Sequence, residues 1–184
     1  MGTRITAVRG VVNSTTNFVL EQLEKGGSVQ AAVREAQKRG FAEADPRIDL
    51  EGWDAAAKTA ILANVFLGAD ITLHDVRRTG LEGITVGDVA RVVRENKRLK
   101  LVCHAHRVEQ KTPGSEPVLE AKVAPVGLPL SDPLAQVTGT SSAVTLETEL
   151  MRAVTVVEND PGLSETAYGV LNDLLELTMK PVPD

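Results

Sequence analysis

The chain has 184 residues, 42% of them hydrophobic and 24% charged, which are ordinary proportions for a globular protein with one sizeable core. Its formal net charge of −5 and pI near 5.3 argue against nucleic acid or an anionic membrane as a partner, because both reward clustered lysine and arginine. Neither a membrane-spanning run nor a signal-peptide pattern occurs. Cys103 is the one cysteine and can form no internal disulfide, so we expect a reducing cytoplasm. From its length, we expect the chain to form a single domain over residues 1–184.

The first part of the chain is predicted to be one strand followed by two helices. Residues 4–13 are rich in β-branched side chains and predict a strand that runs into a turn. Ser14 or Thr15 is then placed to cap a helix that stops at the glycine pair 26–27. A second helix is predicted over residues 28–39, opened by a serine and ended by a glycine. Both helices therefore precede the acidic middle of the chain.

Two more helices are predicted after this point. Pro46 opposes helix in the acidic stretch, which we expect to be a loop. Residues 53–70 are apolar nearly all round, which is typical of a central helix packed on more than one side, and Trp53 is expected to pack its start. Residues 85–97 carry valines at helical spacing and predict an amphipathic helix.

The C-terminal half is predicted to supply antiparallel strands and a last helix. Residues 98–110 alternate apolar and polar side chains and suit a half-buried strand, which a hairpin turn at residues 111–116 joins to a second alternating strand. After an irregular segment, residues 141–160 predict two more strands, and residues 162–180 an amphipathic helix ended by prolines. The predicted class is α+β, with a mixed, largely antiparallel sheet covered by helices on one face.

The stretch FAEADPRIDLEGWDAAAK, residues 41–58, concentrates like charges at the start of the central helix. Residues four apart share a helix face, so Asp54 and Lys58 are neighbours. We expect the pair to point toward the packed side, because the same stripe continues to apolar residues, and small alanines leave room for a ligand beside the ammonium. The stripe continues to Ile61, Leu62 and Val65, and the five carboxylates are Glu43, Asp45, Asp49, Glu51 and Asp54.

Three interpretations of these charges stay open from the residues alone. Asp54 and Lys58 form a salt bridge that stabilises a helix by about 0.2–0.5 kcal/mol, in a stretch that is otherwise simply solvated. Alternatively, the carboxylates and the lysine receive a zwitterion such as an amino acid, because it needs both signs of charge at close range. A divalent cation is the third alternative, although the stretch lacks the regular alternation and the glycine placement of an EF-hand loop.

Two segments carry a resemblance to a known family. GVVNSTTNFVLEQLEKGG at residues 10–27 and AAVREAQKRGFAEADPRIDLEGWDAAAKTAIL at residues 31–62 look like the catalytic domain of homoserine dehydrogenase. That family's pattern reads G-I-L-N-G-T-T-N-Y-I-L and then G-Y-A-E-x-D-P-x-x-D-x-x-G-x-D-x-x-x-K. The likeness continues weakly through residues 128–148 to the last helix. It implies an oxidoreductase that interconverts L-aspartate 4-semialdehyde and L-homoserine with NADH or NADPH, in the biosynthesis of threonine and methionine.

The same resemblance implies roles for individual residues. Glu43 would hold the amino group of the substrate, and Asp49 and Asp54 would hold its polar end. Lys58 would sit at the reacting oxygen. Lys58 and Asp54 are therefore the implied catalytic residues, and Glu43 and Asp49 are implied to bind the substrate.

Asn13 and Thr15, in the segment that matches N-G-T-T, are further implied substrate-binding residues.

Two departures from the family pattern alter the implied pocket. Ser14 stands where the family has glycine, so one close backbone approach is changed. Phe41 stands where the family has tyrosine, so one hydroxyl is missing. The resemblance therefore implies the fold more firmly than it implies the substrate.

The implied cofactor, NAD or NADP, would be bound mainly by a domain that this sequence does not contain. Relatives begin with a Rossmann domain carrying G-x-G-x-x-G, and no such fingerprint occurs here. We therefore expect a Rossmann domain in cis or in trans, and we expect the chain to be inactive alone. The family's glycine-rich segment beside the cofactor corresponds to residues 158–169, which makes Thr166 and Ala167 the implied cofactor-side residues.

Other chemically capable residues favour structural roles. Residues 14–16 suit a helix cap better than a nucleophile, because no G-x-S-x-G elbow surrounds them. His104 and His106 share the polar strand face with Lys100, where histidines are more often solvated than metal ligands, and we expect no metal. Cys103 points to the opposite face and is expected in the core.

The sequence thus favours the catalytic and dimerisation domain of a homoserine dehydrogenase-like oxidoreductase. A two-fold homodimer through the sheet is expected, because a sheet with helices on one face needs a partner to cover the other. One rival is a non-enzymatic module that binds an amino acid or a partner chain, and another is a paralogue with a different substrate. A Rossmann domain in the same reading frame or in a neighbouring gene would distinguish the enzyme from the module.

Overall fold

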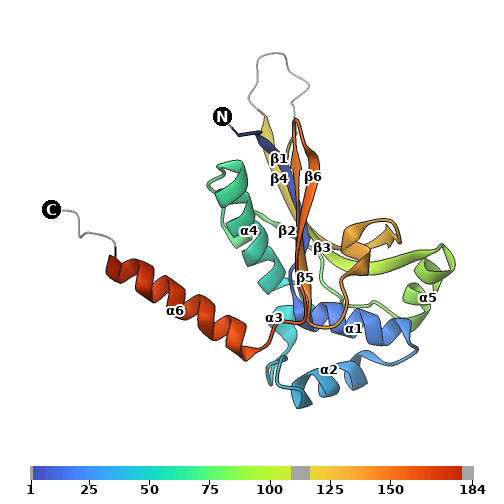
Figure 1. The fold of residues 1–184 in the computed structure, drawn as a ribbon. Coiled ribbons are helices and arrows are strands. Elements are labelled where there is room, and N and C mark those ends of the chain that lie inside the picture. Colours follow the sequence, from blue (N-terminus) through green and yellow to red (C-terminus); the bar gives the residue numbers. More distant parts are fainter. Residues whose placement is uncertain (1, 109–116, 180–184) are drawn as a thin grey trace.

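A six-stranded sheet organises the described part of the chain, residues 2–108 and 117–179, in the computed structural model (Figure 1). Its strands are β1 (Ile5–Val11), β2 (Arg77–Arg78), β3 (Lys97–Val108), β4 (Val118–Pro129), β5 (Ser142–Thr148) and β6 (Arg152–Glu158). Their order is β2-β4-β3-β1-β5-β6, and every neighbouring pair is antiparallel except β2 with β4. The predicted mixed, largely antiparallel sheet is therefore confirmed.

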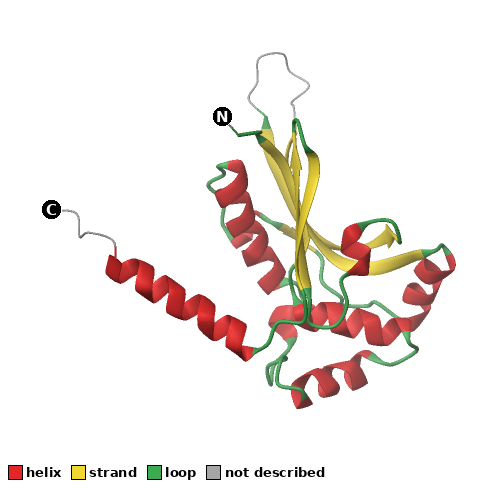
Figure 2. Cartoon of the chain, in the orientation of Figure 1, coloured by secondary structure: helices red, strands yellow, loops and turns green. Residues whose placement is uncertain are grey.

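Six α-helices and two short 3-10 turns accompany the strands in the described residues (Figure 2). They are α1 (Ser14–Glu24), α2 (Val29–Lys38), α3 (Arg47–Leu50), α4 (Trp53–Leu67), η1 (Leu73–Asp75), α5 (Val86–Arg94), η2 (Pro133–Gln136) and α6 (Leu163–Met179). The predicted α+β class is confirmed, as are the paired strands β3 with β4 and β5 with β6. The predicted hairpin turn at 111–116 and the prolines after the last helix lie outside the described residues.

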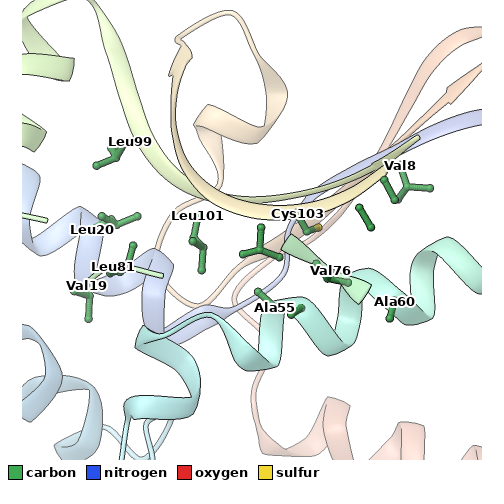
Figure 3. Close-up of a cluster of buried hydrophobic side chains, with 14 of the residues drawn as sticks. Val8, Val19, Leu20, Ala55, Ala60, Val76, Leu81, Leu99, Leu101 and Cys103 are labelled. Carbon is green, nitrogen blue, oxygen red and sulfur yellow. The ribbon is translucent and has the colours of Figure 1, made fainter. Parts of the chain in front are cut away.

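The main core lies between one face of the sheet and helices α1, α4 and α5 (Figure 3). Alternate residues of β3, among them Leu101 and Cys103, point into this core, where Leu20 of α1 is also buried. The side of α4 that faces the sheet is built from alanines such as Ala60, so this helix packs closely against the strands. The close packing brings the start of α4 beside the start of α1.

A second, smaller cluster covers part of the opposite face of the sheet. Leu134 in η2 is fully buried there, against residues such as Val102 of β3. Lys100 was expected on the polar face of β3, but only 3% of it is exposed. Its Nζ donates hydrogen bonds to Oδ1 of Asn17, at 2.7 Å, and to the carbonyl of Val137. The expectation of a polar, half-exposed face fails here because the segment after η2 folds over the strand.

Two predictions about helix starts are wrong. Asn13, not Ser14 or Thr15, caps α1, because its extended backbone lets Oδ1 accept a hydrogen bond from the N–H of Thr16 at 2.8 Å. The acidic stretch is also not wholly a loop, because the short helix α3 follows Pro46. Proline has no backbone N–H, but in the first turn of a helix that N–H would have no partner within the helix. Proline therefore starts a helix more readily than it continues one.

The stripe of α4 that continues from Asp54 and Lys58 is packed only in part, because Leu62 packs against the main core but the other two residues do not. Ile61 is 61% exposed and Val65 is 69% exposed, because α4 turns its alanine side to the sheet. Figure 1 shows α6 extending away from the sheet, and apolar side chains along it, such as Leu171 and Leu174, are exposed as well. Within the described residues, no helix has the length and apolar character needed to cross a membrane.

Candidate active site

An open pocket of about 250 Å³ lies where α1, α3 and α4 begin. Ser14, Phe41, Asp45 and Ile48 contribute to its wall. The pocket also brings together every residue that was predicted to act in catalysis or to bind the substrate, from segments more than forty positions apart in the sequence. Those residues are Asn13, Thr15, Glu43, Asp49, Asp54 and Lys58.

Asp54 and Lys58 are held at the start of α4 by a sharp change of chain direction. Gly52 has φ of 80°, a left-handed conformation that favours glycine, and it separates α3 from α4. Asp54 then lies in the first turn of α4, where the helix dipole favours a carboxylate. Oδ2 of Asp54 is 2.9 Å from Nζ of Lys58, which also donates to the carbonyl of Val12 at 3.0 Å. The lysine therefore bridges α4 and the end of β1.

Asn13 lies between the two carboxylates that were expected to hold the polar end of the substrate. Its Nδ2 donates to Oδ1 of Asp49 at 2.7 Å and to Oδ2 of Asp54 at 2.8 Å. Its Oδ1 accepts from the backbone N–H and from the hydroxyl of Thr16, each at 2.8 Å. Asn13 thus compensates part of the repulsion between Asp49 and Asp54.

The remaining carboxylates of the acidic stretch differ in their partners. Asp45 pairs with Arg47, whose hydrogen bonds lower the pKa of the Asp45 carboxyl to about 2. Glu51 accepts a hydrogen bond from Nε1 of Trp53 at 3.0 Å. Glu43 is exposed, and its backbone carbonyl accepts from the side chain of Gln37 at 2.9 Å. Four of the five carboxylates, all except Glu51, therefore line the pocket, and Asp45 among them has an arginine partner of its own.

Two residues that support this corner were not found by sequence reasoning. The guanidinium of Arg78 lies 3.7 Å from the ring centroid of Trp53 and donates to the carbonyl of Glu51. Gly80 packs against α3 so closely that a Cβ there would be 2.4 Å from the carbonyl oxygen of Leu50. No local sequence pattern around residues 77–81 predicts these contacts, because both are made to a segment about thirty positions earlier.

The charge of the pocket does not fit the pyrophosphate of a dinucleotide. Four carboxylates and a single lysine line it, so it repels anions and suits an ammonium group. Thr166 and Ala167, the predicted cofactor-side residues, are exposed on α6, and neither lines the pocket. The hydroxyl of Thr166 donates to the carbonyl of Gly162 at 3.4 Å. Their part in binding a cofactor stays a prediction.

Among the described residues, the histidines of β3 belong to no group of side chains that could form a metal centre. His104 and His106 stack with ring centroids 4.4 Å apart, and burial, with His106 nearby, lowers the pKa of His104 to about 4. In residues 2–108 and 117–179, no group of three or more His, Cys, Asp or Glu side chains could hold a metal ion.

Cys103 is 1% exposed, as predicted for a core residue, and burial raises the pKa of its thiol to about 11.

Comparison with known proteins decides the family. The family model described as homoserine dehydrogenase matches residues 1–175. The chain belongs to the homoserine dehydrogenase family. The resemblance carried by residues 10–62 is therefore confirmed.

Members of the family from distant organisms match nearly the whole chain. An NAD(+)-dependent homoserine dehydrogenase of Pseudomonas canavaninivorans is 38% identical over 176 residues, which cover 96% of this chain and 48% of that protein. A homoserine dehydrogenase of Sulfurisphaera tokodaii is 37% identical over 176 residues, covering 96% of this chain and 51% of that protein. The chain thus spans about half the length of these relatives.

Solved structures of the family share the fold. The crystal structure of a homoserine dehydrogenase from Thiobacillus denitrificans matches with a TM-score of 0.84 and 32% identity, covering 96% of this chain and 39% of that one. The homoserine dehydrogenase of S. aureus, crystallised at pH 7.5, matches with a TM-score of 0.83 and 28% identity, covering 97% and 43% respectively.

Proposed function

We propose that this chain is the catalytic part of an oxidoreductase that interconverts L-aspartate 4-semialdehyde and L-homoserine with NAD(P)H. The observation that carries the proposal is the pocket in which Asp49, Asp54 and Glu43 meet Lys58. Membership of the family supports the reaction class, and the name of the Pseudomonas relative supports a nicotinamide cofactor. Both compounds of the proposed reaction carry an ammonium and a carboxylate, so they match a pocket that offers both signs of charge.

The exposed carboxylate of Glu43 is proposed to receive the ammonium of the substrate. Asp49 and Asp54 are proposed to hold the polar end of L-homoserine, whose hydroxyl can donate to a carboxylate oxygen that Asn13 does not occupy. Charge-assisted hydrogen bonds of this kind are about twice as strong as those between neutral groups. The acidic stretch is therefore proposed to bind the positively charged group of the substrate, and is not a simple solvated loop.

Lys58 is proposed to act at the carbonyl oxygen of the aldehyde. When bound, the nicotinamide would supply the hydride for the carbonyl carbon, and the ammonium of Lys58 can donate the proton that the carbonyl oxygen needs. The ammonium of Lys58 has three hydrogens, of which Asp54 and the carbonyl of Val12 take two, so one remains for this oxygen. Stabilising the negative charge that develops there is the contribution expected of such a group.

The dinucleotide is proposed to be held mainly by a Rossmann domain supplied in cis or in trans, with residues 1–184 forming one domain beside it. The acidic pocket offers nothing that cradles phosphates, and the curated relatives are about twice as long as this chain. Thr166 and Ala167 are proposed to meet the cofactor from the side of this chain. A setting in the cytoplasm, in the synthesis of threonine and methionine, completes the proposal.

A homodimer through the sheet is also proposed. Strand β6 lies at the edge of the sheet and exposes Val154, Val156 and Val157. An edge strand with exposed apolar side chains is a template for pairing with another chain, and a second copy is the partner expected by symmetry.

The proposal is tested by comparing the isolated chain with the chain joined to a dinucleotide-binding domain of the family. With NADPH and aspartate semialdehyde, the isolated chain should leave the nicotinamide absorbance unchanged, because it lacks a cofactor cradle. The joined protein should oxidise NADPH in proportion to its concentration. Turnover by the isolated chain would refute the proposal that a separate domain binds the cofactor. A joined protein that is folded but inactive would refute the proposed reaction.

A further inference from the structure

Asn13 is buried at the edge of the pocket, unlike the charged residues Lys58 and Glu43. It is 6% exposed, whereas Lys58 and Glu43 are exposed to solvent. The two hydrogens of its Nδ2 go to different carboxylates, Asp49 on α3 and Asp54 on α4, while Asn13 itself precedes α1. One side chain therefore ties the starts of three helices together.

The orientation of the Asn13 amide follows from its partners. A backbone N–H can only donate, so the atom that faces the N–H of Thr16 at 2.8 Å must be the amide oxygen. The hydroxyl of Thr16 donates to the same oxygen at 2.8 Å. Both donors and the acceptor of the Asn13 side chain are therefore used inside the protein, and no side-chain donor remains for a substrate.

A neutral donor at this position solves an electrostatic problem. Asp54 has a cation, Lys58, at 2.9 Å, but in the described residues Asp49 makes no ion pair. Two carboxylates that share one site repel each other, and hydrogen bonds to their charged forms offset this repulsion. A second lysine would offset it too, but it would also cancel the negative charge that attracts an ammonium. An amide satisfies both carboxylates and leaves the net charge of the pocket unchanged.

We propose that Asn13 is a positioning residue, a carboxamide clamp that sets Asp49 and Asp54 for the substrate without touching it. The inference rests on the proposed function and replaces the substrate-binding role that the family resemblance implied for Asn13. The clamp takes one oxygen of each carboxylate and directs the other oxygen to the ligand. It also holds Asp54, and through it Lys58, at a fixed distance from Asp49.

The first test is spectroscopic and does not depend on activity. In the ¹⁵N-labelled full chain, the two side-chain amide protons of Asn13 should resonate downfield of ordinary asparagine protons and exchange slowly with water, because each is bonded to a carboxylate. Asp49→Asn should move one of these protons upfield and Asp54→Asn the other, since a neutral amide oxygen is a weaker acceptor. Ordinary, rapidly exchanging protons that ignore both substitutions would overturn the clamp.

The second test separates positioning from helix capping. Asn13→Ser keeps a good N-cap but removes both donors, so in the enzyme joined to its cofactor domain it should lower kcat about tenfold or more, as misplacement of catalytic groups does. In the Asp54→Asn background the same change should lower kcat by a clearly smaller factor, because one of the two carboxylates that Asn13 positions is already gone. Ser28→Ala, which removes the side-chain cap of α2, is the matched control and should leave kcat unchanged in both backgrounds.

The outcomes distinguish this inference from the proposed function. If the joined wild-type enzyme does not act on homoserine, the proposed reaction fails, and the amide-proton test alone decides on the clamp. If it does act, but Asn13→Ser keeps normal kcat or lowers it equally in both backgrounds, Asn13 is a structural cap and the positioning role is wrong.

Discussion

Asp54 and Lys58 lie one turn apart on α4, with Oδ2 of Asp54 2.9 Å from Nζ of Lys58. Their side chains are 29% and 46% exposed. A helical ion pair at such exposure contributes only about 0.3–0.5 kcal/mol to stability. The pair lines the pocket and reaches the carbonyl of Val12, and we propose that its main role is chemical rather than structural.

Lys58→Ala and Asp54→Asn should therefore each lower the turnover of the chain joined to its cofactor domain by about a hundredfold or more. That is the loss expected when a positioned proton-transfer or electrostatic group is deleted. Steady-state kinetics with aspartate semialdehyde measures it. Lys38→Ala and Glu35→Gln on α2 remove charges that do not line the pocket, and both should keep normal turnover.

Asp49→Asn and Glu43→Gln should leave the free energy of unfolding unchanged or raise it slightly. Each removes one like charge from a crowded pocket, and an asparagine at 49 still offers an oxygen to Asn13. Strained sites commonly exchange stability for activity in this way. Urea denaturation is the measurement. If these variants and those at Asp54 and Lys58 all lose several kcal/mol while turnover stays near normal, the acidic stretch is a structural network.

Much of the fold was predictable because the hydrophobic periods are local. The alternation in β3 and β4 and the glycines and Ser28 around α1 and α2 place most boundaries within a few residues. The prediction that Lys100 lies on an exposed polar face was wrong. Its burial depends on a segment about forty positions later, and no local sequence pattern predicts that contact. The exposed stripe of α4, at Ile61 and Val65, was missed for a similar reason, because composition does not reveal which apolar side faces the sheet.

The site was predictable to the extent that its residues lie in one stretch. Glu43, Asp49, Asp54 and Lys58 meet in a single pocket, as their spacing and the family pattern suggested. What compensates the carboxylates was only partly foreseen. Lys58 was expected to do so, but the amide of Asn13 depends on how α1 docks beside α4, which is a tertiary contact.

The buried Lys100 should make stability rise with pH on the alkaline side. Burial, together with the charge of Arg98, lowers the pKa of Lys100 from 10.5 to about 8. Between these values the unfolded chain holds more protons than the folded chain, so the free energy of unfolding increases with pH, by at most about 1.4 kcal/mol per pH unit. This contribution is largest above pH 10.5 and is lost as the pH falls to about 8.

Chemical denaturation at several pH values from about 7 to 10 tests this linkage. The wild-type chain should gain stability relative to Lys100→Met across this range, because the variant has no group to titrate at that position. Two curves that stay parallel would show that Lys100 does not titrate in this window.

The proposed dimer predicts twice the chain mass by light scattering at micromolar concentration. Val156→Glu places a charge on the exposed edge strand β6, where Val156 is 64% exposed, and should shift the equilibrium to monomer. Val93→Glu on α5, where the side chain is 40% exposed, introduces the same charge away from the sheet edge and should leave the dimer intact. A monomer mass for the wild-type chain would count against the dimer.

The most direct test of the central claim, that the acidic pocket receives a zwitterionic amino acid, is isothermal titration of the full chain with L-homoserine. We expect binding in the wild type, and an affinity at least about tenfold weaker in Glu43→Gln, because a charge-assisted bond to the ammonium is lost. Glu35→Gln removes a carboxylate of α2 that pairs with Arg39 and does not line the pocket, and it should bind like the wild type. No binding by the folded wild type, or equal affinity in all three proteins, would contradict the account.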